Sequence, residues 1–134
     1  MKLVHATHED RNKILRAIGR KNISYITNKQ VRNDYELGHL YVVKEDNQVL
    51  ATVSLVRERE YNYYAIKRLC VLNKGNCGKG IGSFAVRELS KVVSGERVGA
   101  TPWTDNIAMR NLLESEGYQL QYVFNERWCF YAKD

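Results

Sequence analysis

The stretch Asn76–Ser83, NCGKGIGS, places three glycines at alternate positions around one lysine. The apolar run IKRLCVL (residues 66–72) precedes it, and a helical pattern begins directly after it. Glycine loses more conformational freedom on folding than any other residue, so three of them within five positions require a structural reason. A strand that leads through such a loop into a helix exposes backbone amides where the helix dipole favours anions. The stretch therefore predicts a site for a diphosphate.

Two familiar nucleotide-binding motifs do not match this loop. A Walker A loop requires G-x-x-x-x-G-K-[ST], but Asn73 stands at the first glycine position and Gly80 follows Gly78-Lys79. A dinucleotide fingerprint requires G-x-G-x-x-G, whereas the glycines here run G-x-G-x-G. The plain alternative, a tight turn that allows close packing of a helix on a strand, stays open.

The composition is that of a globular protein: 134 residues, of which 44% are apolar and 27% charged. We expect a single domain, residues 1–134. No apolar run approaches the roughly 20 residues of a membrane span, and the N-terminus lacks the apolar core of a signal peptide. The three cysteines are an odd number without metal-ligand spacing, which predicts reduced thiols in a cytoplasmic protein and no metal site.

The net charge of +6 comes from 21 basic and 15 acidic residues that are scattered along the chain. A solvated basic surface is the simplest interpretation, and attraction to a small phosphorylated ligand or to nucleic acid is the sharper one. The aromatic cluster YNYY (residues 61–64) would suit stacking on nucleic-acid bases. Because the basic residues are not concentrated, we do not expect a nucleic-acid partner.

Short apolar runs rich in β-forming residues predict strands along the chain. These strands cover residues 2–7, 39–45, 48–58, 61–72, 96–103, 118–124 and 127–133. Two capping boxes, Thr7 with Asp10 and Thr27 with Gln30, predict helices between the first two strands, the second ending near Gly38.

Two further helices follow the glycine loop. Apolar residues on one face of the first are Ile81, Phe84, Ala85, Leu89, Val92 and Val93. Thr104 or Asp105 is the expected cap of the second, and Gly117 its left-handed C-terminal residue. The apolar side of that helix comprises Ala108, Met109, Leu112 and Leu113. The element order predicts an α+β fold with helices packed on a mixed sheet.

Residues 66–89, IKRLCVLNKGNCGKGIGSFAVREL, resemble the acetyl-CoA loop of the GNAT superfamily of N-acetyltransferases, whose pattern after a strand is [QR]-x-x-G-x-[GA]. Residues 106–118, NIAMRNLLESEGY, resemble the later motif of the same family through Asn106, Gly117 and Tyr118. The resemblance implies a GNAT-like mixed, mostly antiparallel sheet that is splayed between its central strands and has helices on both faces. The strand order of nearly the whole chain agrees with it.

The resemblance also implies a position for acetyl-CoA, in the gap between the strand ending near Val71 and the strand beginning near Val98. Backbone groups of the first strand would pair with the pantetheine arm, loop amides would hold the pyrophosphate, and Asn106 would reach the pantetheine from the other side. The implied cofactor-binding residues are Leu69, Cys70, Val71, Cys77, Gly78, Lys79, Gly80, Ile81, Gly82, Ser83 and Asn106.

The catalytic positions of the family are less well matched. Leu113 stands where many members carry a tyrosine that protonates the leaving thiolate, and Ala65 stands near the position of a glutamate base. Cys77 replaces the usual glutamine or arginine. Tyr118 is the candidate general acid, since a phenol is a workable acid toward a thiolate; the alternative is that its hydroxyl only completes the packing. The sequence thus predicts an acetyltransferase that acts by direct amine attack, with a non-catalytic acyl-CoA-binding or sensing module as the alternative.

The acceptor is expected to be a small-molecule or peptide amine. It would enter past an aromatic wall formed by Tyr25, Tyr35, Trp103 and Trp128. No dense acidic cluster marks this region, which disfavours a polycationic acceptor. A monomer and a homodimer are both compatible with the sequence.

Overall fold

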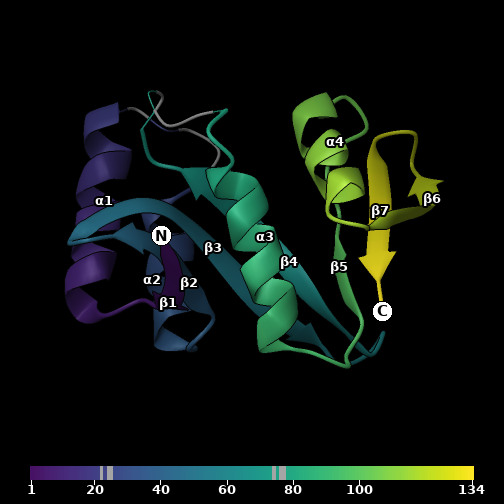
Figure 1. The fold of residues 1–134 in the computed structure, drawn as a ribbon, viewed down its shortest axis with the longest axis horizontal. Helices are drawn as coiled ribbons and strands as arrows, with labels where there is room; N and C mark the ends of the chain where they lie inside the picture. Colours follow the sequence, from purple (N-terminus) through teal and green to yellow (C-terminus); the bar gives the residue numbers. More distant parts are fainter. Residues whose placement is uncertain (22, 24–25, 74, 76–77) are drawn as a thin grey trace.

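The computed structural model describes residues 1–21, 23, 26–73, 75 and 78–134. The predicted order of strands and helices is confirmed (Figure 1). The strands are β1 (Lys2–His5), β2 (Leu40–Glu45), β3 (Gln48–Glu58), β4 (Tyr63–Val71), β5 (Val98–Ala100), β6 (Gln119–Phe124) and β7 (Trp128–Lys133). The helices are α1 (His8–Lys21), α2 (Asn28–Glu36), α3 (Ile81–Val92) and α4 (Ile107–Ser115). None of these helices is long and apolar enough to cross a membrane.

One sheet runs through the described part of the chain in the order β1-β2-β3-β4-β5-β7-β6. Its neighbours pair antiparallel except β4 and β5, which pair parallel. This is the mixed, mostly antiparallel sheet that the sequence predicts. The parallel pair is possible because α3 carries the chain back across the sheet between β4 and β5.

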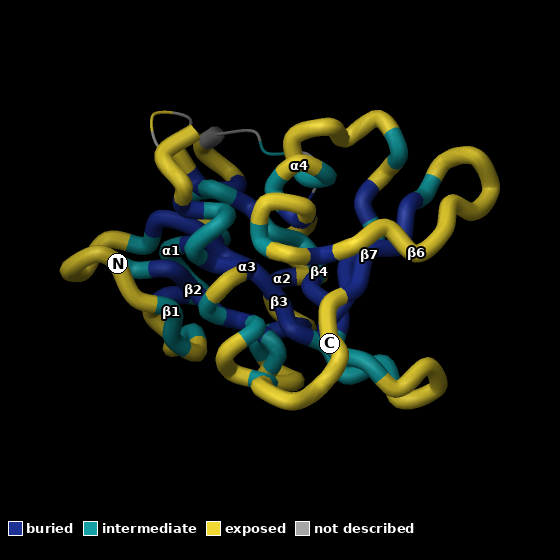
Figure 2. Tube along the Cα trace, turned by 45° about the vertical axis from the view of Figure 1, so that its right-hand side comes forward, coloured by how far each residue is buried: buried dark blue, intermediate teal, exposed yellow. Residues whose placement is uncertain are grey.

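The sheet is buried on both faces because its central strands are apolar at successive positions (Figure 2). In β2, Leu40 and Val42 pack against α1 and α2, whereas Tyr41 and Val43 belong to the cluster beneath α3. Successive side chains of a strand point to opposite faces, so one strand contributes to both cores. The predicted arrangement of helices on both faces is therefore confirmed.

The first two helices begin at the predicted capping boxes. The backbone N–H of Thr7 donates to Asp10 Oδ2 at 3.0 Å, and the N–H of Asp10 donates to Thr7 Oγ1 at 3.1 Å. Thr27 and Gln30 make the same reciprocal pair at 3.0 and 3.1 Å. Each of these hydrogen bonds joins residues three positions apart in sequence, so the sequence alone locates both helix starts.

The start of α4 differs from the prediction. Asn106, rather than Thr104 or Asp105, caps the helix, and its Oδ1 accepts the N–H of Met109 at 3.1 Å. The reason is tertiary: the N–H of Thr104 donates to Arg127 O at 2.8 Å, so the chain is still bound to the last hairpin at that point.

Two other expectations need correction. Val92 was expected on the apolar face of α3 but is 52% exposed, whereas Val86 is fully buried. The helix therefore turns the Val86 side of its surface toward the sheet. Strand β5 covers residues 98–100 instead of 96–103, because the following residues leave β4 and continue along β7.

Candidate active site

The two central strands separate after a short contact. Strand β4 pairs with β5 only at Tyr64↔Val98 and Ala65↔Gly99. Beyond Ala100 the chain follows β7 instead: the N–H of Cys129 donates to Pro102 O at 3.0 Å, and Trp103 bridges Trp128. The strands therefore diverge toward the top of Figure 1, and the predicted splay of the sheet is confirmed.

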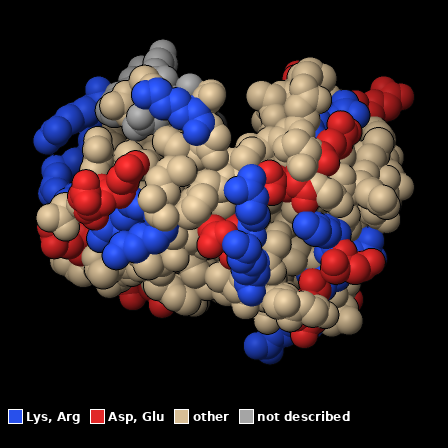
Figure 3. All heavy atoms as spheres, viewed as in Figure 1, with Lys and Arg blue, Asp and Glu red and all other residues tan. Residues whose placement is uncertain are grey.

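A cleft of about 580 Å³ lies where the strands diverge. Residues 65–69 of β4 form one wall, residues 100–103 and Trp128 form the other, and Asn106 and Met109 reach it from α4. In the space-filling view, the outline of the molecule is notched between the N-terminal end of α3 and α4 (Figure 3). From Ile66 onward, no described strand pairs with this edge of β4, so an extended ligand could take the place of a strand there.

A β-bulge bends β4 beside the cleft. Thr52 faces Cys70 and Ser54 faces Lys67, so two residues of β4, Arg68 and Leu69, oppose one residue of β3. The φ of Arg68 is +54°, a conformation that costs energy for a residue with a side chain. The bulge therefore needs support from the surrounding structure.

Helix α2 supplies that support through a buried carboxylate. Asp34 is 2% exposed and accepts two hydrogen bonds from Arg68, each at 2.7 Å. The hydroxyl of Ser54 donates to the same carboxylate at 2.6 Å. A bidentate pair of this kind holds the guanidinium in one orientation, and it joins α2 to the bulge of β4.

The glycines of the loop have two different structural reasons. Gly78 and Gly80 each have a φ of +79°, which glycine adopts at no steric cost, and a Cβ on either would meet no atom of the described residues within 4 Å. Gly82 has no such φ, but its Cβ would lie 2.9 Å from Leu112 Cδ1 and 3.6 Å from Leu69 Cδ2. The first two glycines shape an open loop, and the third lets α3 pack closely on α4 and β4.

The N-terminus of α3 carries backbone N–H groups that have no partner within the helix. Gly80 is its N-cap, none of the described side chains caps it, and the first intrahelical bond runs from the N–H of Phe84 to Gly80 O at 2.9 Å. The amides of residues 81–83 precede that bond and lack partners within the helix. Since Leu69 both lines the cleft and packs beside Gly82, this anion-attracting helix end borders the cleft.

The cofactor-binding residues expected from the sequence are only partly gathered here. Leu69 and Asn106 line the cleft. The side chain of Cys70 is 1% exposed and packs in the α1–α2 core, so only its backbone remains for a ligand at the edge of β4. Cys77 lies outside the described residues. The binding roles of all these residues stay predictions.

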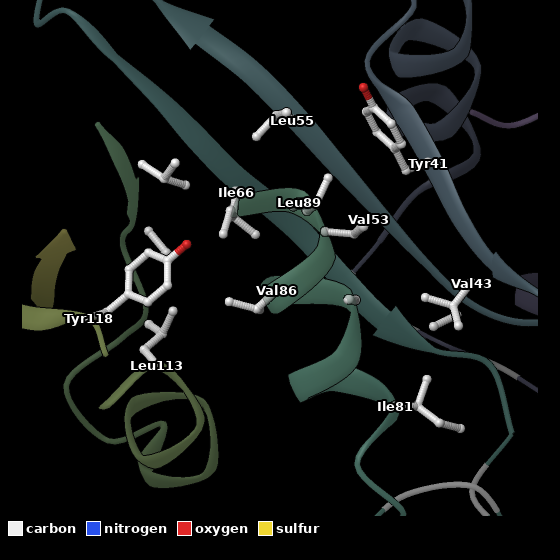
Figure 4. Close-up of a cluster of buried hydrophobic side chains, with 14 of the residues drawn as sticks. Tyr41, Val43, Val53, Leu55, Ile66, Ile81, Val86, Leu89, Leu113 and Tyr118 are labelled. Carbon is white, nitrogen blue, oxygen red and sulfur yellow. The ribbon is translucent and has the colours of Figure 1, made fainter. Parts of the chain in front are cut away.

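Tyr118, the candidate acid, lies away from the cleft lining. Its side chain is 2% exposed, and its hydroxyl lies 2.6 Å from Ser90 Oγ on α3. Figure 4 shows Tyr118 and Leu113 in the same buried cluster as Val86. Burial raises the pKa of the Tyr118 hydroxyl, and the hydrogen bond with Ser90 offsets part of the rise. The catalytic role of Tyr118 stays a prediction, and this geometry disfavours it.

We expect Tyr118→Phe to leave unchanged the acetyl transfer that the sequence resemblance implies, and to lower the stability by about 1 kcal/mol, because only one buried hydrogen bond is lost. Release of CoA from acetyl-CoA, followed with a thiol reagent, measures the first quantity, and urea denaturation measures the second. A large fall in CoA release with the stability preserved would instead identify Tyr118 as the acid.

The structure adds residues to the site that the sequence did not single out. Glu58, at the end of β3, and Lys67 both line the cleft, and Glu58 Oε1 lies 2.8 Å from Lys67 Nζ. The register of β3 and β4 places them on one face of the sheet, with Glu58 opposite Tyr63 and Lys67 opposite Ser54, and the two long side chains meet along that face. The two consecutive strands predicted over residues 48–58 and 61–72 were the available signal for this pair.

The predicted aromatic wall is present in part. Trp103 and Trp128 line the cleft and make an edge-to-face pair with their ring centroids 5.3 Å apart. Tyr35 packs against the α1–α2 core, with the guanidinium of Arg11 5.2 Å from its ring centroid. Tyr25 lies outside the described residues.

The face of the molecule shown in Figure 3 gives no argument for a nucleic-acid interface. On the face shown in Figure 3, lysine and arginine side chains are interspersed with aspartate and glutamate. Among the described residues, no group of histidine, cysteine, aspartate or glutamate is arranged to hold a metal ion. The cleft, bordered by one edge of β4 and by the N-terminus of α3, is therefore the candidate ligand site.

Comparison with known proteins agrees with the family resemblance found in the sequence. Residues 6–118 match the model of the Acetyltransferase (GNAT) family. No curated protein matches the chain in sequence. The fold is similar to that of a GNAT-family acetyltransferase from Streptococcus agalactiae 2603, with a TM-score of 0.79 and 16% identity over 98% of this chain and 94% of that one.

Two other solved structures share this fold. One is Arabidopsis thaliana Naa50 in complex with the bisubstrate analogue CoA-Ac-MVNAL, with a TM-score of 0.73 and 12% identity over 99% of this chain and 97% of that one. The other is an aminoglycoside 6'-N-acetyltransferase complexed with coenzyme A, with a TM-score of 0.77 and 9% identity over 99% and 96% of the two chains.

Proposed function

The chain belongs to the GNAT family of acetyltransferases, and from that premise we propose that it transfers the acetyl group of acetyl-CoA to a primary amine by direct attack of the amine on the thioester. The family uses acyl-CoA. We also propose that residues 1–134 act as one acetyltransferase domain. The single observation that carries the proposal is the cleft between β4 and β5, with the N-terminal amides of α3 at its border.

The described residues suit acetyl-CoA at both ends of the ligand. The open space beside Gly78 and Gly80 leaves room for a diphosphate at the α3 amides, and exposed Lys79 adds positive charge. Backbone groups of β4 from Leu69 to Val71 would bind the pantetheine through hydrogen bonds, as an added strand does. Asn106 would contact it from the opposite wall.

Acetyl-CoA supplies the activated acyl group, and the protein supplies proximity and a route for protons. Among the described residues that line the cleft, Glu58 carries the only carboxylate. We assign it the part of proton acceptor for the attacking amine, which Ala65 cannot take. Trp103 and Trp128 would bind the apolar part of the acceptor, which we take to be a small-molecule or peptide amine.

Calorimetric titration with acetyl-CoA, beside ATP and NAD, tests the proposal. We expect micromolar binding of acetyl-CoA alone. The chain contains two tryptophans and both line the cleft, so quenching of their fluorescence should accompany the binding. Absence of binding at millimolar acetyl-CoA would overturn the proposal.

Asn106→Asp separates the ligand contact from the helix cap. The carboxylate of aspartate still accepts the N–H of Met109, so we expect the stability to change by only a few tenths of a kcal/mol. The variant loses the amide donor and places a negative charge beside the ligand. The affinity for acetyl-CoA should therefore fall about tenfold, equivalent to about 1.4 kcal/mol. Asn106→Ser is the control, because serine also keeps a capping oxygen but adds no charge. Unchanged affinity for acetyl-CoA in both variants would exclude a contact through Asn106.

A further inference from the structure

The side chain of Lys67 places a primary amine in the cleft. It lies on β4, it lines the cleft, and its Nζ is 2.8 Å from Glu58 Oε1. Its side chain is 40% exposed and that of Glu58 is 31% exposed, so the pair is open to the cleft without being fully solvated. It is the only lysine among the described residues that line this cleft.

We propose that Lys67 is acetylated on Nζ by the protein's own bound acetyl-CoA. This inference rests on the proposed function, because it requires acetyl-CoA in the cleft. The arrangement has the parts of the transfer reaction: a primary amine beside the expected thioester position, and a carboxylate within hydrogen-bond distance of that amine. Lys67 occupies the position at Glu58 that the ammonium group of an external acceptor would take.

The step balances without any further reactant. The Lys67 ammonium gives one proton to Glu58 and becomes a neutral amine. Its lone pair attacks the carbonyl carbon of acetyl-CoA, so that the N–C bond forms while the C–S bond breaks. The second proton of the nitrogen goes to the sulfur, CoA leaves as the thiol, and Glu58 releases its proton to water.

The modification would change the acceptor end of the cleft. Acetylation removes the positive charge of Lys67, so its ion pair with Glu58 is lost. The added acetyl group also occupies space that an external amine would need. Self-acetylation is therefore expected to reduce the use of external acceptors.

Lys91 provides a matched control within the same chain. Its Nζ lies 2.8 Å from Glu88 Oε2, the same separation as in the Lys67–Glu58 pair. It is on α3, it is 69% exposed, and it does not line the cleft. Its acetylation measures the uncatalysed reaction of a paired lysine with acetyl-CoA in solution.

The experiment is incubation of the purified chain with deuterium-labelled acetyl-CoA, followed by peptide mass spectrometry at each lysine. We expect Lys67 to be labelled at least tenfold faster than Lys91, with a rate constant independent of protein concentration. Glu58→Gln should slow the acetylation of Lys67 about a hundredfold and leave the acetylation rate of Lys91 unchanged. Equal rates at the two lysines, or a rate constant that rises with protein concentration, would overturn the proposal.

A second measurement does not depend on turnover. N-hydroxysuccinimidyl acetate labels accessible lysines directly, and saturating CoA should protect Lys67 while it leaves Lys91 reactive. Lack of protection would place the amine away from the ligand and overturn the inference.

The calorimetric titration distinguishes the two proposals. If acetyl-CoA binds but Lys67 is labelled no faster than Lys91, only self-acetylation fails. If acetyl-CoA does not bind, the proposed function fails and self-acetylation fails with it.

Discussion

Gly80→Val is expected to lower the affinity for acetyl-CoA roughly 100-fold. The φ of Gly80 is +79°, which valine tolerates poorly, so the N-cap of α3 must change conformation. The amides of residues 81–83 then no longer converge on one anion. Loss of two hydrogen bonds to a charged group, at about 1.5 kcal/mol each, corresponds to roughly 100-fold in affinity.

Gly95→Val is the matched control for this substitution. Gly95 lies just after the C-terminal end of α3 and has a φ of +88°. A Cβ at this position would meet no atom of the described residues within 4 Å. Both variants should lose about 1–2 kcal/mol of stability from backbone strain, but only Gly80→Val should lose affinity in calorimetry. Equal affinities in the two variants would mean that the loop is a tight turn without a ligand.

Asp34→Ala is expected to destabilise the fold by about 3–5 kcal/mol. The substitution leaves the guanidinium of Arg68, 24% exposed, without its carboxylate and leaves the Ser54 hydroxyl without its acceptor. It also removes the contact that supports the strained Arg68 in the bulge of β4. Urea denaturation followed by far-UV circular dichroism measures the loss.

Glu88→Ala is the comparison for an exposed ion pair. Its partner Lys91 is 69% exposed, so we expect a change of no more than about 0.5 kcal/mol. If Asp34→Ala costs no more than Glu88→Ala, the buried pair does not hold the bulge. A fall in acetyl-CoA affinity that accompanies the loss of stability in Asp34→Ala would link the bulge to ligand binding.

Much of the fold was predictable because its signals are local. The capping boxes at Thr7 and Thr27 each close within four residues, and the apolar run of a strand such as β2 depends only on its own residues. The glycine loop and the later motif beginning at Asn106 were predicted for the same reason. Local sequence sets hydrogen bonds and periodicity over short distances, so it determines the type and order of the elements, whereas the start of α4 depended on a contact with the last hairpin.

The details of the site were decided by contacts between distant parts of the chain. The Glu58–Lys67 pair follows from the register of β3 and β4, and the width of the cleft follows from the pairing of residues 102–103 with β7. Tyr118 was a reasonable acid in the sequence, but its position in the core beneath α3 directs its hydroxyl to Ser90. By itself, the sequence determined the order of elements, the loop and the family resemblance. Only the tertiary structure decided which side chains face the cleft, because register and packing join residues that no local pattern connects.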